Sequence, residues 1–219
     1  MELNRAIDGY CERLGPGLWA EPWNAVTNLA FIVAALIMWR RCGGSGLAGL
    51  LCAALFLIGL MSGLFHTHAV VWTAAADSLS ILVFILIYLF GANRLFLGLD
   101  RGPSLGGVVL FFPYAIGLGY VFARIAPWLG GSVGYAPIPV LILGYAAFLR
   151  KRLPEVAQGL AIGAVILVVS IGFRAVDEAI CPHVVKGTHF VWHILNAIML
   201  AWMIEIYRRH ALAPAPDGR

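Results

Sequence analysis

Charge is scarce in this 219-residue chain, and that scarcity narrows the class of protein it can be. Only 12% of the residues are Asp, Glu, Lys or Arg, whereas 61% are hydrophobic, and the mean hydropathy is +0.88. A water-soluble domain needs a charged shell around its core, and this composition cannot supply one. The net charge of +4 comes without a basic stripe interleaved with aromatic residues, so no nucleic-acid partner is expected.

The two ends of the chain lack long apolar runs. Residues 1–22 carry four acidic side chains and have no apolar core of the kind that a cleaved signal peptide requires. We therefore expect residues 1–22 to form an extramembrane segment and 23–208 to form the membrane domain. Residues 209–219 would form a C-terminal tail, whose Ala-Pro-Ala-Pro at 213–216 is of low complexity.

Seven apolar stretches lie between these ends. A membrane-spanning helix needs about 20 apolar residues to cross a hydrocarbon core about 30 Å thick. The pattern predicts an all-α membrane protein, a seven-transmembrane helix bundle in which short loops make successive helices antiparallel neighbours. Pro113 interrupts the fourth stretch, and Pro137 and Pro139 the fifth, which predicts kinks or ragged ends there. The stretches are 23–40, 47–66, 77–95, 105–123, 134–150, 156–175 and 188–207.

The distribution of Lys and Arg predicts the orientation of this bundle. Five lie on the side of the N-terminus: Arg5, Arg13, Arg124, Arg174 and Lys186. Ten lie on the other side: Arg40, Arg41, Arg94, Arg101, Arg150, Lys151, Arg152, Arg208, Arg209 and Arg219. Because the richer side faces the cytoplasm, the N-terminus is expected outside and the C-terminus inside. The compact loops favour a bacterial inner membrane.

The four cysteines divide between the two sides. Cys11 and Cys181 fall on the outward side, where an oxidising compartment would permit a disulfide, although two unrelated thiols fit the sequence as well. Cys42 and Cys52 are placed inward and within the membrane, so both are expected to stay reduced.

Histidine and aspartate at membrane depth point to a metal site. Ionisable groups there are costly unless they are paired or functional. His189 and His193 are four residues apart, so they share one helix face and can bind one metal ion. His66 closes the second stretch, and Asp77 opens the third, which places all four groups at the same end of the bundle. Zinc held by three imidazoles keeps a fourth position open, as hydrolytic sites do.

Plainer interpretations exist for each of these residues. Membrane histidines commonly pack by hydrogen bonding, and Ser62, one turn before His66, can bond back to its own helix instead of contacting a substrate carbonyl. Asp177 can support a ligand imidazole or pair with Arg174, and the pairing is favoured by spacing. Nothing in their spacing selects His68 or His183 as ligands.

The N-terminal segment holds a second group of polar residues. Glu12 and Glu21, with Asp8 nearby, can supply oxygen ligands to calcium, or they can form an acidic cap in which Glu21 interacts with the dipole of the first helix. Asn24 and Asn28 share a helix face and are expected to bond neighbouring helices.

Together these motifs resemble the alkaline ceramidases. Cys11-Glu12, then Glu21-Pro22-Trp23-Asn24 with Asn28, resembles the N-terminal signature of that family. Ser62-x-x-x-His66, Asp77 and His189-x-x-x-His193 resemble the zinc pattern of a wider superfamily of seven-helix membrane hydrolases. The resemblance spans nearly the whole chain.

The resemblance implies a zinc-dependent amidohydrolase that cleaves ceramide, a membrane lipid, to a sphingoid base and a fatty acid. It implies His66, His189 and His193 as zinc ligands, Ser62 and Asp77 as catalytic partners, and a Cys11–Cys181 disulfide. It also implies calcium at Glu12 and Glu21, although Leu14 stands where the family has an amide ligand.

Two competing functions remain open at the level of sequence. One is a hydrolase of another lipid amide or ester, because both carbonyls require the same attack geometry. The other is a seven-helix receptor or transporter that uses its histidines structurally. Transporters more often break their helices near the membrane midplane, whereas this polar cluster lies near one end. The sequence leaves the chain-length preference and the oligomeric state undetermined.

Overall fold

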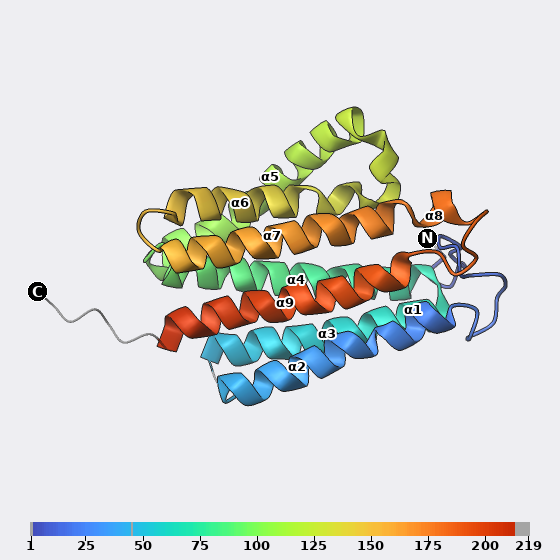
Figure 1. Cartoon of the computed structure of the whole chain (residues 1–219), viewed down its shortest axis with the longest axis horizontal. Coiled ribbons are helices and arrows are strands. Elements are labelled where there is room, and N and C mark those ends of the chain that lie inside the picture. The colour runs from blue at the N-terminus through green and yellow to red at the C-terminus, as the bar shows by residue number, and fades with distance from the viewer. Residues whose placement is uncertain (1, 45, 213–219) are drawn as a thin grey trace, which may run out of the picture.

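The computed structural model describes residues 2–44 and 46–212, and these form a bundle of helices (Figure 1). No strand occurs among them apart from an isolated antiparallel bridge between Ala6 and Val70. The elements are α1 Pro22–Thr27, α2 Leu29–Cys42, α3 Gly46–His68, α4 Val71–Leu95, α5 Arg101–Ile125, the 3-10 helix η1 Pro127–Tyr135, α6 Pro137–Leu149, α7 Pro154–Ala175, α8 Asp177–Ile180 and α9 His189–Leu212.

The predicted membrane bundle is confirmed. Six segments are long and apolar enough to cross a membrane, and α1 and α2 together form the first of them. This makes the protein a multi-pass integral membrane protein. The number of spans reaches seven if η1 and α6 are counted as one broken span. Helix α9 continues five residues past its predicted end at 207, and the low-complexity stretch 213–216 lies outside the described residues.

The fifth predicted stretch is a bent pair and not a straight helix. Helices η1 and α6 meet at an angle of 60°, with Pro137 as the first residue of α6. Gly130 has non-helical dihedral angles inside η1, which breaks that segment a second time. At about 1.5 Å per residue, the 13 residues of α6 reach only about 20 Å, less than the membrane core. Pro113, in contrast, lies within a continuous α5.

Helix α9 lies at the centre of the bundle and packs against α2, α3, α4 and α7. Glycines allow α7 to approach it closely. A Cβ atom at Gly159 would lie 2.9 Å from Ile206, and one at Gly163 would lie 2.7 Å from the Met203 sulfur. Small residues at such contacts allow helix backbones to come together in membranes. This packing fixes α9, which carries two of the predicted metal ligands.

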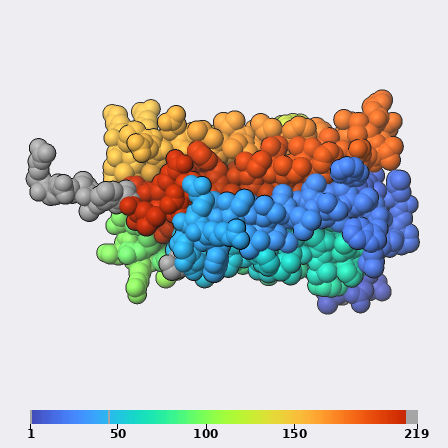
Figure 2. Space-filling model, turned by 60° about the horizontal axis from the view of Figure 1, so that its bottom comes forward, coloured from blue at the N-terminus to red at the C-terminus, as the bar shows by residue number. Residues whose placement is uncertain are grey.

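The N-terminal segment covers one end of the bundle, the end where α9 begins (Figure 2). The Cys11–Cys181 disulfide is present, with the two Cα atoms 5.3 Å apart. The backbone N–H of Ile7 also donates to the carbonyl of Ala69 at 2.7 Å, between α3 and α4. Cys42 and Cys52 are free, as predicted. The covered end is therefore tied to both halves of the chain.

Candidate metal centre

Three histidines converge at the covered end of the bundle. His66 lies in the last turn of α3, and His189 begins α9, with His193 one turn further along. One ring nitrogen from each lies within 4.8 Å of those of the other two, and all three side chains are buried. The structure thus brings together the three predicted ligands, although His66 is more than 120 residues from the other two.

The unpaired atoms of these rings show that the site suits a metal ion. His66 Nε2, His193 Nε2 and His189 Nδ1 are buried and have no hydrogen-bond partner among the described residues. A buried polar atom without a partner is destabilising, so three of them facing one point indicate a missing common partner. Neutral imidazole nitrogens are typical ligands of zinc and other transition metals. His66, His189 and His193 therefore form a group that can hold a metal ion.

Hydrogen bonds on the far side of two rings direct the free nitrogens inward. His66 Nδ1 donates to Glu21 Oε2 at 2.6 Å. The hydroxyl of Thr27 donates to the carbonyl of Trp23 at 2.7 Å, so it accepts from His193 Nδ1 at 3.0 Å. With Nδ1 protonated, each ring presents Nε2 as a lone pair to the metal position, the arrangement common in metal sites.

Glu21 is held as a carboxylate beside His66. Burial acts to raise its pKa, but hydrogen bonds from His66, Asn24 and Arg13 outweigh burial and lower the pKa. Asn24 Nδ2 donates to Oε2 at 3.1 Å, and Arg13 pairs with Oε1. This carboxylate fixes the tautomer and the orientation of the His66 ring.

Replacing Glu21 with glutamine should weaken metal binding by about 10–100-fold, the usual effect of removing such a supporting carboxylate. Titration of the purified protein against a zinc-binding dye would measure the change. Glu12→Gln is the matched control, because both Glu12 oxygens accept from the backbone N–H groups of Trp23 and Asn24, at 2.6 and 2.8 Å, and so cap α1. Equal zinc affinity in the two variants would contradict the role assigned to Glu21.

Calcium ligation by Glu12 and Glu21 stays a prediction, and the contacts in the structure give both residues roles within the protein. All four carboxylate oxygens have protein donors, and His66, His189 and His193 form the one group in the described part of the chain that could hold a metal ion. Asn24 and Asn28 differ from expectation. Asn28 Nδ2 donates to the Asn24 carbonyl in the same helical segment, so neither amide donates to a neighbouring helix.

Asp77 and Ser62, the two predicted catalytic residues, lie together beside the histidines. Helix α4 begins at Val71, so Asp77 is in its second turn and not at its start as predicted. The hydroxyl of Ser62 faces the Asp77 carboxylate, and His66 is within electrostatic range. Asp77 Oδ1 is buried without a hydrogen-bond partner among the described residues. The site therefore combines three potential ligands with a free carboxylate oxygen and a hydroxyl.

Asp177 has a role that its local spacing did not reveal. Its Oδ1 accepts from the backbone N–H groups of Thr188 and His189, at 2.6 and 2.8 Å, and so caps α9 at its first ligand. Its Oδ2 accepts from Cys11 N at 3.0 Å. The favoured pairing with Arg174 is wrong, because Arg174 makes no ion pair with Asp177 among the described residues. The true partners are 11, 12 and 166 residues away, beyond any local pattern.

Tyr10 was not predicted to contribute and lies directly on the site. Its ring stacks on His189 with the centroids 3.9 Å apart. Its hydroxyl accepts from Arg174 Nη2 at 3.3 Å, and burial raises its pKa to about 12, so the phenol is neutral. Arg174 also donates to Ser132 Oγ at 2.8 Å. Tyr10 thereby closes the site from the extramembrane side.

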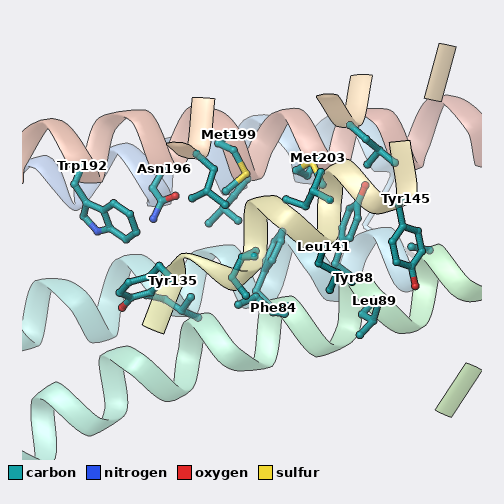
Figure 3. Close-up of a pocket in the computed structure, with 18 residues that line it drawn as sticks. Phe84, Tyr88, Leu89, Tyr135, Leu141, Tyr145, Trp192, Asn196, Met199 and Met203 are labelled. Carbon is teal, nitrogen blue, oxygen red and sulfur yellow. The ribbon is translucent and has the colours of Figure 1, made fainter. Parts of the chain in front are cut away.

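An apolar cavity lies inside the bundle, and its lining includes residues of α9 that follow the histidines (Figure 3). Its free volume is about 80 Å³, and it is lined by residues of α4, η1, α6, α7 and α9. Trp192, the neighbour of His193, lines the end nearest the histidines, with its ring centroid 4.9 Å from that of Tyr135. The apolar lining is typical of a small-molecule site.

Comparison with known proteins adds no assignment: no family model matches the sequence, and no curated protein matches it significantly. Membership of the alkaline ceramidase family therefore stays a prediction.

Proposed function

We propose that this protein is an intramembrane zinc-dependent hydrolase of lipid amides and that ceramide is its substrate. The observation that carries the proposal is the group of three buried, unpaired histidine nitrogens within 4.8 Å of one another. Beside this group lies a free carboxylate oxygen, and beneath it lies an apolar cavity. This combination favours a hydrolase over a receptor or transporter that uses its histidines structurally.

Zinc is the metal that this ligand set favours. Three imidazoles without a thiolate or a carboxylate in the group form the donor set of catalytic zinc sites, which leave one position open. When bound, zinc would supply a Lewis acid that polarises a carbonyl and lowers the pKa of water.

Asp77 and Ser62 supply the proton transfer and the hydrogen bonding. The free Oδ1 of Asp77 would take a proton from the attacking water and later give it to the departing amine. The Ser62 hydroxyl, held beside that carboxylate, would donate to the carbonyl oxygen as negative charge develops there. The cover formed by Tyr10 and the N-terminal segment would limit the entry of bulk water.

The cavity gives a lipid chain a place to lie. Its walls come from α4, α7 and α9, which are long and apolar enough to span a membrane, and from the bent pair η1 and α6. One side is open, so we propose that a lipid enters laterally from the bilayer. The Cys11–Cys181 disulfide supports the predicted orientation, because disulfides persist in oxidising compartments. The metal end would then face outward, with the C-terminus in the cytoplasm, in a bacterial inner membrane.

Lipid hydrolysis measured by mass spectrometry tests the proposal. Detergent-purified protein and its His193→Ala variant would be incubated with ceramides and with other lipid amides and esters. We expect wild-type protein alone to release a sphingoid base and a fatty acid. Cleavage of a different lipid would replace the proposed substrate, and no turnover by folded, zinc-loaded protein would overturn the proposed activity.

A further inference from the structure

The proposed mechanism leaves some polar residues of α9 without a role. Among these, Asn196 lies closest along the helix to the metal ligands. It lies three residues after His193, about 4.5 Å further along the helix axis at 1.5 Å per residue. It lines the apolar cavity, and Figure 3 shows its amide pointing from α9 into that space. Asn196 thus stands between the metal site and the chain-binding part of the cavity.

The carbonyl oxygen of the Asn196 amide has no hydrogen-bond partner in the described part of the chain. The side chain is buried. In an apolar membrane protein interior, water cannot readily replace that partner, so the unpaired carbonyl is destabilising. A ligand that carries a hydrogen-bond donor would remove this cost.

A second asparagine of the same bundle shows how a structural amide behaves. Asn93, also buried, donates from Nδ2 to the Ser104 carbonyl at 3.2 Å and accepts at Oδ1 from the Tyr145 hydroxyl. Both ends of that amide are satisfied by neighbouring helices. The Asn196 carbonyl oxygen, in contrast, has no partner in the ranges 2–44 and 46–212, and the side chain lines a cavity, which distinguishes a ligand-binding amide from a packing one.

We propose that Asn196 is a specificity-determining residue that binds a hydroxyl group of the lipid, close to the bond that is cleaved. The inference rests on the proposed function, because the position of the metal sets the distance between Asn196 and the carbonyl that is attacked. A hydroxyl is the favoured group, since it can both donate to Oδ1 and accept from Nδ2. Its position about one helical turn from His193 corresponds to a hydroxyl roughly four bonds from the scissile carbonyl. The substrate class is therefore a lipid amide hydroxylated next to its amine-bearing carbon.

Binding of two amines that contain no hydrolysable bond would test this inference without relying on turnover. 2-Aminooctadecan-3-ol and octadecan-2-amine differ only by the hydroxyl in question. Equilibrium binding to the zinc-loaded full-length protein in detergent would use radiolabelled probes. Wild-type protein should bind the hydroxylated amine about tenfold more tightly, the upper range for one hydrogen bond in a protein interior.

Asn196→Leu should bind the two amines with affinities within a factor of two, and Asn196→Ala should do the same if the larger side chain disturbs folding. Zinc content would verify folding, because His189 and His193 are on the same helix. Tyr88→Phe is the matched control. It removes another buried, unpaired polar atom from the same cavity, but Tyr88 contacts Tyr207, about 20 Å along α9 from His193. It should keep the tenfold preference.

A preference retained by Asn196→Leu, lost by Tyr88→Phe, or absent from the wild type would overturn the role of Asn196, as would failure of both amines to bind. These outcomes are separable from the proposed function. Ceramide cleavage with no hydroxyl preference would leave the hydrolase proposal standing. A preference without cleavage of any lipid would retain Asn196 as a binding residue and remove the hydrolase proposal.

Discussion

His193→Ala should abolish stoichiometric zinc binding while the helix bundle stays folded. The substitution removes one of three ligands and leaves two, and two imidazoles cannot complete a closed or catalytic zinc site. The loss of zinc affinity should exceed the 10–100-fold expected for Glu21→Gln, because His193→Ala removes a metal ligand, whereas Glu21→Gln removes only the carboxylate that orients one. Turnover of lipid should be lost together with the metal.

Metal analysis of protein purified in parallel would measure this effect. Wild-type protein should carry one zinc ion per chain, and its unfolding temperature should fall after treatment with a chelator, since a ligand that binds only the folded state stabilises it. His183→Ala is the control, because His183 is exposed and outside the histidine group. One zinc per chain in His193→Ala would remove His193 from the ligand set.

The sequence contained enough information to predict the histidine group. His189 and His193 are four residues apart in one helix, so helical geometry alone places them on one face. Topology placed His66 and Asp77 beside them, because the four antiparallel passes predicted between the end of α3 and the start of α9 return the chain to the end of the bundle where His66 and Asp77 lie. Apolar runs in a membrane leave few alternatives to helices, which made this topology predictable.

The supporting residues could not be predicted in the same way, because their partners are distant in sequence. Glu21 contacts His66 across 45 positions, and Asp177 contacts Cys11 across 166. The local sequence pattern predicted that Glu21 interacts with a helix dipole or with calcium, and it favoured an ion pair between Asp177 and Arg174. In each case the local sequence pattern suggested one interaction, whereas the partner in the folded structure lies far away in the sequence.

The broken span and Asn196 are cases in which a signal was present in the sequence. Pro137 and Pro139 predicted a disturbance at the 60° bend between η1 and α6, but no pattern reveals the second break at Gly130 inside η1. Asn196 is a polar residue at membrane depth one turn from His193, and the rule that such residues are costly applies to it equally. The structure is needed to distinguish it from Asn93, whose amide is hydrogen-bonded to other helices, whereas Asn196 lines the cavity.

Asp77→Asn should retain zinc but lower kcat by about 10²–10⁴-fold, the usual contribution of a general acid–base residue. The amide has the same shape as the carboxylate, so the contact with Ser62 and the packing of α4 should survive. Because the amide cannot accept a proton from water, the chemical step should fail while substrate binding remains. KM should therefore change far less than kcat.

Two further variants separate proton transfer from a general electrostatic effect, since Asp77 also lies within electrostatic range of the Arg174 cation. Asp77→Glu keeps the negative charge but moves the oxygen by one methylene group. If the charge only balances Arg174, this variant should recover most of the activity; if it transfers a proton, a shifted oxygen should leave kcat low. Ser80→Ala is the control for disturbance of α4, because Ser80 Oγ donates to the Asp77 backbone carbonyl at 2.7 Å and not to its carboxylate. Wild-type turnover by zinc-loaded Asp77→Asn would exclude Asp77 from the reaction, and another group would then have to accept the proton.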